Sequence, residues 1–409
     1  MKNNNKKLLI VSEKYSPSLS TDSILMTQLA EDLFQMGRDV SILTSRLIET
    51  NGKLSSKEVI NSICVKRMHC LKLPGNSTII KILNRIFLMI SSIFYIPYMR
   101  RFSIVMCLST PPLFPLTGAI ARVLFHNKFV FLLYDLYPEV AELMGLTKHN
   151  SITYKFINYL YRYIFKHADR IICLGRDIQK YLVSVKMVPF EKTVIITNWA
   201  DSKSIVSKNP NHYFRKKKGI EKKFLVTYSG NLGLFHDFDT IIDAAKILEE
   251  AGEDNIIFAI VGRGDQKAKV VSTVNQIGLK NIIFDDFMPS EEHYDLLASS
   301  DVLLTTLKLG VENCSVPSKT YPYIVSGKPV IAIMSPDSEI ALTIMEEDAG
   351  YVVKPGDASL LVEILKSLIC DSEKLLAIST NAKDAGMRRF TRSKVTPMYE
   401  TLFQSLDNE

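Results

Sequence analysis

Hydrophobic and polar positions along the 409-residue chain follow two alternating periods. Short runs of apolar and β-branched residues lead into a Gly, Ser or Asp turn, and then into stretches whose apolar positions recur every three or four residues. The first such unit pairs a strand at 8–11 with a helix at 22–36, in which Leu25, Leu29 and Leu33 share one face. Repetition of this unit is typical of a parallel sheet covered by helices.

The pattern runs through the chain twice and predicts two doubly wound, Rossmann-like α/β domains. The first domain spans 1–202, and its strands are expected at 8–11, 40–43, 104–108, 129–133, 170–174 and 193–197. A polar, basic stretch at 203–223 interrupts the alternation and is interpreted as a solvated linker. The second domain spans 224–386, with strands expected at 225–229, 256–261, 282–285, 302–305, 329–333 and 350–353. Residues 387–409 contain a final helix, which we expect to pack back on the first domain.

Composition is consistent with two ordinary cores and places few limits on the ligand. Apolar residues make up 47% of the chain and charged residues 23%, so disorder is not expected. The net charge of +7 is compatible with an anionic ligand, an anionic membrane surface or nucleic acid. Charge alone therefore does not choose a partner.

Cysteine spacing and the N-terminal residues indicate a cytoplasmic protein. The cysteines have neither Cys-x-x-Cys spacing nor nearby histidines, which predicts reduced thiols and no metal site; they are Cys64, Cys70, Cys107, Cys173, Cys314 and Cys370. Residues 1–7 are polar and lead directly into the first strand, so they lack the apolar region of a signal peptide.

Residues 86–99 form a nearly continuous apolar run flanked by Lys81, Arg85, Arg100 and Arg101. The run is shorter than the roughly 20 residues that a membrane-spanning helix needs. Two interpretations remain open: a helix buried against the sheet, or an amphipathic helix that docks on a lipid surface beside its basic flank.

Glycine-rich turns follow the first two strands of the second domain. Gly230 and Gly233 lie in the first turn, and Gly262 and Gly264 lie in the next. Glycine lets the backbone approach a ligand closely, and the N-terminus of the following helix offers N–H groups to a phosphate. A plain tight turn would also use glycine. The turns nevertheless share one edge of the predicted sheet, the edge where ligands of such sheets bind.

The order of these motifs resembles the glycosyltransferases of family 4, which have the GT-B fold. The matching segments of the second domain are 230–233 (GNLG), 262–264 (GRG), 286–290 (DFMPS), 298–301 (ASSD), 317–319 (PSK) and 326–331 (SGKPVI). Those of the first domain are 15–17 (YSP), 109–112 (STPP), 135–139 (DLYPE), 168–169 (AD) and 198–201 (NWAD). The pattern is most similar to the branch that builds bacterial surface polysaccharides, such as O-antigen or capsule.

The resemblance implies a fold, a reaction and partners. The two domains would face each other across a cleft, and the chain would transfer a sugar, of hexosyl or N-acetylhexosaminyl type, from a UDP-sugar with retention and without a metal or other cofactor. The acceptor would be a polysaccharide or a polyprenyl-diphosphate-linked glycan, at the inner face of the cell membrane. The membrane contact would lie in the Lys81–Arg101 region. No nucleic acid partner is expected.

The same resemblance, together with the turn positions, predicts the site residues. Donor-binding residues are expected to be Gly230, Asn231, Gly233, Leu234, His236, Gly262, Arg263, Met288, Glu312, Ser318, Lys319 and Thr320. Acceptor-side residues are expected to be Ser20, Thr21, Asp135 and Glu139. Among these, Asp135 and Lys319 are the predicted catalytic residues.

The chain departs from the family pattern where charge would hold the diphosphate. Many members carry an Arg and, five residues on, a Lys in the first turn of the second domain; here these positions are Asn231 and His236. We therefore expect Lys319, Arg263 and backbone N–H groups at 233–234 to supply the positive potential. A histidine in such a loop could contact phosphate or be solvated.

Two further departures concern the ribose and the first domain. The family's Glu-x7-Glu signature, whose second Glu typically binds the donor ribose, is replaced by Cys314 and Pro322, and Glu312 could substitute from two residues earlier. The Gly-rich turn that many members have in the first domain is replaced by 16–22. There Ser20 and Thr21 could donate hydrogen bonds to phosphate or cap the following helix.

Asp135 follows the predicted strand at 129–133 and should therefore face the ligand edge of the first domain. Its carboxylate could take the proton of an acceptor hydroxyl, or it could cap a turn. Glu139 could equally lie in the first turn of a helix.

Two alternative functions remain open within this fold. The missing Arg, Lys and Glu would suit a catalytically silent subunit that only binds a nucleotide sugar. A nucleotide-sugar 2-epimerase would need acidic and histidine residues to move the C2 proton, and the few histidines disfavour it. A dinucleotide-binding oxidoreductase is disfavoured more strongly, since no Gly-x-Gly-x-x-Gly follows the first strand with an acidic residue after the second.

Overall fold

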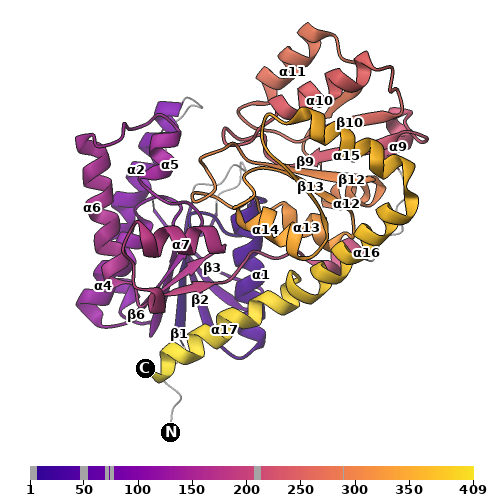
Figure 1. Ribbon diagram of the computed structural model, residues 1–409. Helices are drawn as coiled ribbons and strands as arrows, with labels where there is room; N and C mark the ends of the chain where they lie inside the picture. Colours follow the sequence, from indigo (N-terminus) through magenta and orange to yellow (C-terminus); the bar gives the residue numbers. More distant parts are fainter. Residues whose placement is uncertain (1–6, 47–53, 70–72, 74–77, 207–212, 289) are drawn as a thin grey trace. The chain divides into compact units, whose positions relative to one another are not determined.

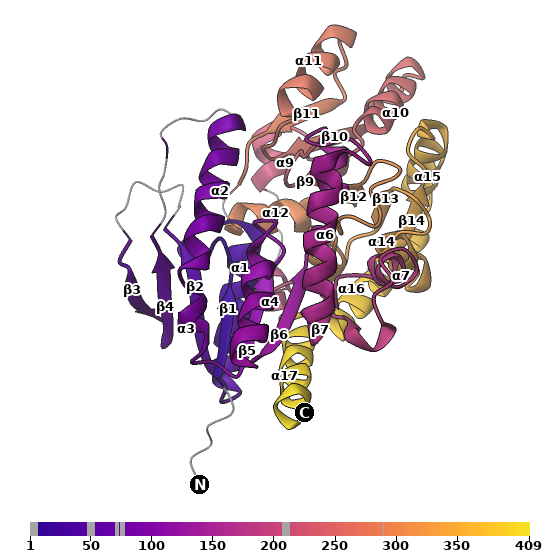
Figure 2. The same cartoon turned by 90° about the vertical axis from the view of Figure 1, so that its left-hand side faces the viewer.

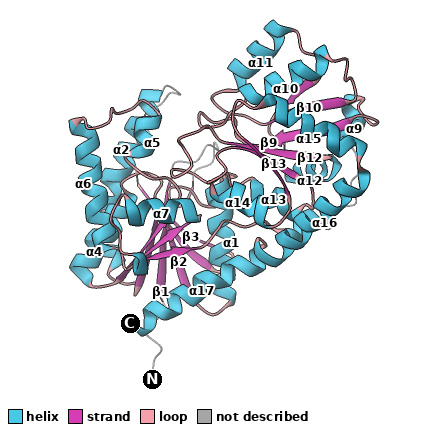
Figure 3. Cartoon of the chain, in the orientation of Figure 1, coloured by secondary structure: helices cyan, strands magenta, loops and turns pink. Residues whose placement is uncertain are grey.

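The computed structural model describes residues 7–46, 54–69, 73, 78–206, 213–288 and 290–409. The chain folds as two compact units, one formed by Met1–Thr197 with Val395–Glu409 and the other by Asn198–Lys394. Each unit contains one sheet with its own helices (Figure 1, Figure 3). Both are Rossmann-like α/β units, as the alternating pattern predicts.

The first unit has an eight-stranded sheet in the order β3-β4-β2-β1-β5-β6-β7-β8. Its strands are β1 (Lys7–Val11), β2 (Asp39–Ser45), β3 (Lys57–Ile60), β4 (Ile63–Met68), β5 (Ile104–Leu108), β6 (Lys128–Leu133), β7 (Arg170–Cys173) and β8 (Thr193–Ile195). Its helices are α1 (Thr21–Gln35), α2 (Thr78–Ile93), α3 (Ile96–Met99), α4 (Phe114–Phe125), α5 (Glu139–Leu143), α6 (Ile152–His167), α7 (Arg176–Ser184) and the 3-10 helix η1 (Phe190–Lys192). The central strands are apolar throughout because helices cover them; Leu8, Leu9, Ile10 and Val11 of β1 are fully buried.

The edge hairpin β3–β4 is the one antiparallel pair of this sheet among the described strands, and the sequence pattern did not predict it. Asn61 and Ser62 form its two-residue turn, with φ angles of 48° and 68°. A turn with φ above zero at both central residues matches the twist of a hairpin, and Asn tolerates this conformation. Asn61 was thus the local sequence signal for the hairpin. The two strands themselves are too polar to be recognised from the pattern of apolar residues.

The second unit has a six-stranded, fully parallel sheet in the order β11-β10-β9-β12-β13-β14. Its strands are β9 (Phe224–Ser229), β10 (Ile256–Val261), β11 (Ile282–Asp285), β12 (Val302–Thr306), β13 (Val330–Ile333) and β14 (Gly350–Val353). Its helices are α8 (Ser202–Val206), α9 (Tyr213–Lys218), α10 (Asp239–Glu250), α11 (Lys267–Ile277), α12 (Ser290–Ser299), α13 (Thr320–Val325), α14 (Glu339–Glu346), α15 (Ala358–Cys370) and α16 (Ser372–Arg389). These six strands match the expected positions within two residues.

The stretch 203–223, expected to be a solvated linker, instead belongs to the second unit and contains α8 and α9; its residues 207–212 lie outside the described residues. Arg215 in the basic run is buried. Its guanidinium donates to the carbonyls of Ser299 (2.7 Å) and Lys223 (2.5 Å) and to the Asp301 carboxylate (2.6 Å). Three acceptors make burial of this charge possible, which a charge run by itself does not reveal.

Gly386 does not end the second unit as expected, because α16 continues through it to Arg389. A Cβ at Gly386 would lie 2.7 Å from the Val325 Cα, which shows how closely α16 packs on α13. The glycine therefore serves helix packing rather than helix termination.

The last helix, α17 (Arg392–Asn408), packs on the first unit through a buried charge cluster. The fully buried Arg38 donates to both carboxylate oxygens of Glu400 (2.6 and 3.1 Å) and to Asp407 (2.9 Å). Its guanidinium also lies 5.3 Å from the Phe403 ring centroid. Thr396 donates to Asp32 of α1 at 2.7 Å.

We predict that Arg38→Ala lowers the free energy of unfolding of the first unit by about 3–5 kcal/mol, because it leaves two carboxylates without their buried cation. Urea unfolding, followed by the far-ultraviolet circular dichroism of the backbone, measures the change in the free energy of unfolding. Arg388→Ala is the control, since Arg388 is exposed and its ion pair with Glu347 should contribute less than about 1 kcal/mol. Equal losses in the two variants would contradict the structural role of the cluster.

Candidate functional site

The turns after β9 and β10 stack directly on each other at the carboxyl edge of the second sheet. The Gly230 N–H donates to the Val261 carbonyl (2.9 Å), and the Leu232 N–H donates to the Arg263 carbonyl (2.8 Å). Gly262 has φ +143°, and a Cβ there would lie 1.9 Å from the Gly230 carbonyl oxygen. Only glycine permits this approach, so the two predicted turns form one surface.

Lys319 reaches this surface from the start of α13. Its ammonium donates to the Tyr228 hydroxyl and lies 3.6 Å from the centroid of the same ring. A Cβ on Gly230 would lie 3.3 Å from Lys319 Cε, so the glycine leaves room for the lysine chain. The site thus brings together Gly230, Gly262 and Lys319 as the sequence predicts, and adds Tyr228 beneath the lysine.

The charge of Lys319 lacks a compensating carboxylate. Burial lowers the pKa of Lys319 well below its usual value. In the described part of the chain, no carboxylate forms an ion pair with Lys319; its polar contact is the Tyr228 hydroxyl. A buried ammonium of this kind is stabilised when an anion binds beside it.

His236 lies on the other side of Tyr228 and is neutral. Burial, followed by the nearby Lys319, lowers the pKa of His236 well below its usual value. Its Nδ1 accepts the Gly233 N–H at 3.1 Å and lies 3.0 Å from the Tyr228 hydroxyl. Since Nδ1 accepts, the ring hydrogen is on Nε2, where it can be donated to a ligand.

This geometry changes one expected contact. The Gly233 N–H, expected to contact a phosphate directly, is used by His236. The Gly233 carbonyl is also occupied, since it accepts from the Gln266 side chain at 2.5 Å. The turn therefore presents His236 in place of its own backbone at Gly233.

Several other expected donor residues have structural contacts. Met288 is buried in a hydrophobic cluster with Leu225 and Val261, and Thr320 is buried with its hydroxyl 3.1 Å from that of Thr305. Pro289 of the same motif lies outside the described residues. Met288 and Thr320 thus stabilise the elements that carry the turns.

The remaining donor-side residues are more accessible. The exposed Arg263 guanidinium lies 5.0 Å from the Phe287 ring centroid. Glu312 accepts the Gly310 N–H at 3.1 Å, within its own turn. Asn231 and Leu234 are exposed, and Ser318 is half-buried. The side chains of Asn231, Leu234 and Ser318 are therefore available to a ligand.

Two residues that the sequence did not single out hold the end of β9. The Tyr323 hydroxyl accepts from the Ser229 N–H (2.9 Å) and donates to the Ser229 carbonyl (2.6 Å). The His293 Nδ1 lies 3.1 Å from the Ser229 hydroxyl, and burial lowers the pKa of His293 to about 4. Neither residue lies in a glycine-rich turn, so no sequence signal linked it to this site.

Asp135 is half-buried at the carboxyl edge of the first sheet. The Ser109 hydroxyl accepts the Asp135 N–H at 2.9 Å, and the Thr110 hydroxyl lies 3.4 Å from the carboxylate. Burial, and then the nearby carboxylate of Asp22, raise the pKa of Asp135 to about 6. Asp22, in the first turn of α1, was not among the predicted residues; burial raises its pKa as well.

The other acceptor-side predictions separate into two groups. Glu139 forms an ion pair with Lys186 and accepts from the Tyr181 hydroxyl at 3.1 Å, so its carboxylate is held within the unit. Ser20 occupies the N-cap of α1 without a side-chain capping bond, and Thr21 is exposed. The Thr21 hydroxyl is therefore accessible, whereas the hydroxyl of the half-buried Ser20 accepts from that of Ser18 at 3.4 Å.

Helix α2 has one buried and one exposed apolar face. Leu88 is fully buried. The opposite face exposes Leu83, Ile86, Ile90 and Ile93, and Phe94 is exposed directly after the helix, with exposed fractions from 36% to 78%. Helices of the described residues are all too short or too polar to cross a membrane. The Lys81 side chain lies outside the described part of the structure.

Metal-ligating residues do not gather anywhere in the described ranges: no group of three or more His, Cys, Asp or Glu side chains could hold a metal ion. The described cysteines are all free. Cys70 lies outside the described residues.

We predict that Asp135→Asn stabilises the protein above pH 6 by about 2 kcal/mol and has no effect below pH 4. The raised pKa of Asp135 means that the folded state favours the protonated carboxyl, so the stability of the wild type falls as pH rises from about 4 to about 6. Thermal unfolding across this range measures the difference, with the exposed Asp265→Asn as control. A pH-independent difference for Asp135→Asn would contradict this interpretation.

Comparison with known proteins agrees with this arrangement. The model for "Glycosyltransferase Family 4" matches residues 23–204, and the model for "Glycosyl transferases group 1" matches residues 211–385. The "Probable glycosyltransferase WbjE" of Pseudomonas aeruginosa is 27% identical over 274 residues, 66% of this chain and 67% of that protein. WcaI of Escherichia coli strain K12, named for colanic acid biosynthesis, is 28% identical over 169 residues, 40% of each protein.

Solved structures share the fold over almost the whole chain. Sucrose-phosphate synthase from Thermosynechococcus elongatus has a TM-score of 0.78 at 15% identity, covering 98% of this chain and 99% of that one. HepE from Anabaena in complex with UDP-glucose has a TM-score of 0.73 at 17% identity, with 98% and 99% covered. WaaG, a glycosyltransferase of lipopolysaccharide biosynthesis, has a TM-score of 0.67 at 17% identity, with 97% and 99% covered. The chain therefore belongs to the glycosyltransferases of family 4 and has their GT-B fold.

Proposed function

We propose that this glycosyltransferase transfers a sugar, with retention, from a UDP-sugar to a lipid-linked glycan during assembly of a bacterial surface polysaccharide. The observation that carries the proposal is the uncompensated Lys319 ammonium, held on Tyr228 between two stacked glycine turns. HepE, which shares the fold, is solved with UDP-glucose, and relatives are named for polysaccharide biosynthesis.

Lys319 and His236 together replace the charged pair that the sequence lacks in the first turn. The ammonium supplies positive charge, and the Nε2–H of the neutral His236 supplies a directed hydrogen bond. The diphosphate in turn supplies the anion that a buried ammonium requires. Positive potential at this point stabilises the charge that develops on the leaving UDP.

The reaction exchanges one bond to the anomeric carbon for another on the same face. The bond from C1 to the diphosphate oxygen breaks, and its electron pair stays on the phosphate. The acceptor hydroxyl oxygen bonds to C1, and its proton passes to the departing phosphate. Asp135, mostly ionised at neutral pH with a pKa of about 6, accepts a hydrogen bond from the acceptor hydroxyl and orients it.

Membrane contact is proposed for the exposed face of α2. The apolar face lies beside exposed Arg85, Arg100 and Arg101, which suits an anionic lipid surface. Helices α2, α4 and α6 lie side by side (Figure 2), and α6 also exposes Ile152, Phe156 and Tyr159. Exposed apolar side chains on two helices that both pack against α4 favour a lipid surface, where a lipid-linked acceptor would be found.

Lys319→Gln is expected to weaken UDP binding about 30-fold, because it removes a charged hydrogen bond worth roughly 2 kcal/mol. Tyr228→Phe retains the ring beneath the lysine and should weaken binding less. Calorimetry or the thermal shift with UDP and UDP-sugars measures both, with the exposed Lys246→Gln as control.

Unchanged UDP affinity in Lys319→Gln would contradict the phosphate role of this lysine. Binding of nucleotide sugars without transfer to any acceptor would instead indicate the silent binding subunit.

The triple variant Ile86→Ser, Ile90→Ser and Phe94→Ser should bind vesicles containing phosphatidylglycerol at least about 30-fold more weakly than the wild type, since each side chain loses its burial in lipid. Vesicle sedimentation measures the affinity. The control replaces three apolar residues that are exposed on other helices with Ser: Leu376, Met387 and Met398. Leu88 is left unchanged because it belongs to the core. Equal sedimentation of the two triple variants would contradict docking through α2.

A further inference from the structure

A cationic pocket lies at the amino edge of the first sheet, away from the edge that carries Asp135. It has a volume of about 600 Å³, in the range of small-molecule sites. Its walls come from the C-terminal ends of α4 and α6, the start of β7, and η1. The proposed reaction uses none of these residues.

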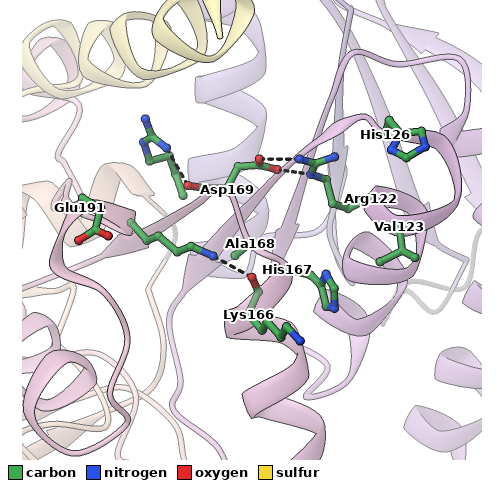
Figure 4. A pocket seen from close by; sticks show the side chains of 10 residues that line it. Arg122, Val123, His126, Lys166, His167, Ala168, Asp169 and Glu191 are labelled. Atoms are coloured by element: carbon green, nitrogen blue, oxygen red, sulfur yellow. Dashed lines mark hydrogen bonds and ion pairs between the residues drawn. The ribbon is translucent and has the colours of Figure 1, made fainter.

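The pocket contains more positive than negative side chains. Arg122, Lys166, Arg170 and Lys192 line it with two histidines, against the carboxylates of Asp169 and Glu191; the histidines are His126 and His167. Asp169 is already neutralised, since both its oxygens pair with Arg122 at 2.9 and 3.2 Å (Figure 4). Arg170 in turn pairs with Glu409. Lys166 and Lys192 against Glu191 therefore leave an excess of one positive charge before either histidine is counted.

Four of the polar side chains have no hydrogen-bonding partner within the described residues: the Lys166 ammonium, the rings of His126 and His167, and the Glu191 carboxylate. Figure 4 shows Lys166 and His167 close together on one side of the pocket, with Glu191 on the other side. Lys192, in contrast, donates to the Lys166 carbonyl at 2.7 Å.

The cations of the pocket affect the pKa of His167. Burial, and then the cations Lys166, Lys192 and Arg122, lower the pKa of His167. Burial lowers the pKa of Lys192 as well, whereas the carboxylates of Asp169 and Glu191 raise it and outweigh the opposing effect of Arg122 and Arg170.

Cations near the C-termini of α4 and α6 also complement the helix dipoles, and that role accounts for part of the charge. That role alone would require neither a cavity nor charged side chains from four different elements. Lys192 comes from η1 and Arg170 from β7, outside both helices.

From this geometry we infer that the pocket binds a phosphate-bearing anion, held by Lys166, His167 and Lys192. Phosphate suits this set because its oxygens accept several charged hydrogen bonds at once. The anion has two possible sources, a free phosphate or diphosphate and the headgroup of an anionic phospholipid. The exposed apolar side chains of Val123 and Leu124 lie beside the pocket and are compatible with the second source.

The test follows the imidazole signal of His167 by NMR during titration with inorganic phosphate and with pyrophosphate at constant ionic strength. A local signal separates this pocket from phosphate binding at Lys319 in the other unit. We expect a saturable shift of the signal and a rise in the pKa of His167, because a bound anion stabilises the imidazolium. Lys166→Glu should weaken binding about tenfold or more, and the neutral Lys166→Gln should weaken it less.

Lys155→Glu is the matched control, because Lys155 is an exposed lysine of the same helix that does not line the pocket. Sedimentation with phosphatidylglycerol and phosphatidylcholine vesicles forms the second arm. A response to phosphate or pyrophosphate identifies a free anion. A loss of phosphatidylglycerol binding in Lys166→Glu but not in Lys155→Glu identifies a headgroup.

The inference is overturned if the His167 signal shifts without saturation and vesicle binding is the same in Lys166→Glu and Lys155→Glu. It is also overturned if Lys166→Glu, with an unchanged melting temperature, binds every probe as the wild type does. The failure of this test would leave the function proposed for Lys319 and α2 unaffected, since neither involves the pocket.

Discussion

The candidate site of the second unit depends on the close approach of two backbone turns. A side chain at Gly262 would collide with the Gly230 carbonyl, and a side chain at Gly264 would lie 2.4 Å from the Leu232 carbonyl. Without this approach the turns after β9 and β10 could not share hydrogen bonds, and the missing side chain of Gly230 leaves the space that Lys319 occupies. A parallel sheet brings the turns to one edge, but the glycines determine how closely they pack.

The consequence is a site in which one lysine supplies the buried charge. Lys319 rests on the ring and hydroxyl of Tyr228, and the same hydroxyl lies beside His236. Neutral His236 and the electron-rich ring stabilise the ammonium less than a carboxylate would. The charged form of Lys319 is therefore disfavoured in the free protein, and an anionic ligand would stabilise it. The fold in this way favours an anion as the ligand.

The sequence predicted the elements of this site better than their contacts. Strand positions and glycine turns follow from local periodicity, and Lys319 followed from the motif that contains it. His293 and Tyr323 could not be predicted, because they reach Ser229 from helices distant in sequence. Similarly, Met288 and Thr320 lie in matching motifs, yet their side chains pack inside the unit.

Burial of charge is where sequence and structure differ most. Arg215 looked solvated within a basic run, and Arg38 gave no signal at all, yet both are buried with carboxylate partners far along the chain. The sequence by itself determined two α/β units, the strands of the second unit, most strands of the first and the glycine-rich turns, because these depend on periods of two and 3.6 residues and on backbone conformation. The tertiary structure alone decided which charges are paired, which pKa values shift and where a cationic pocket forms, because those depend on distances between residues that the chain order does not encode.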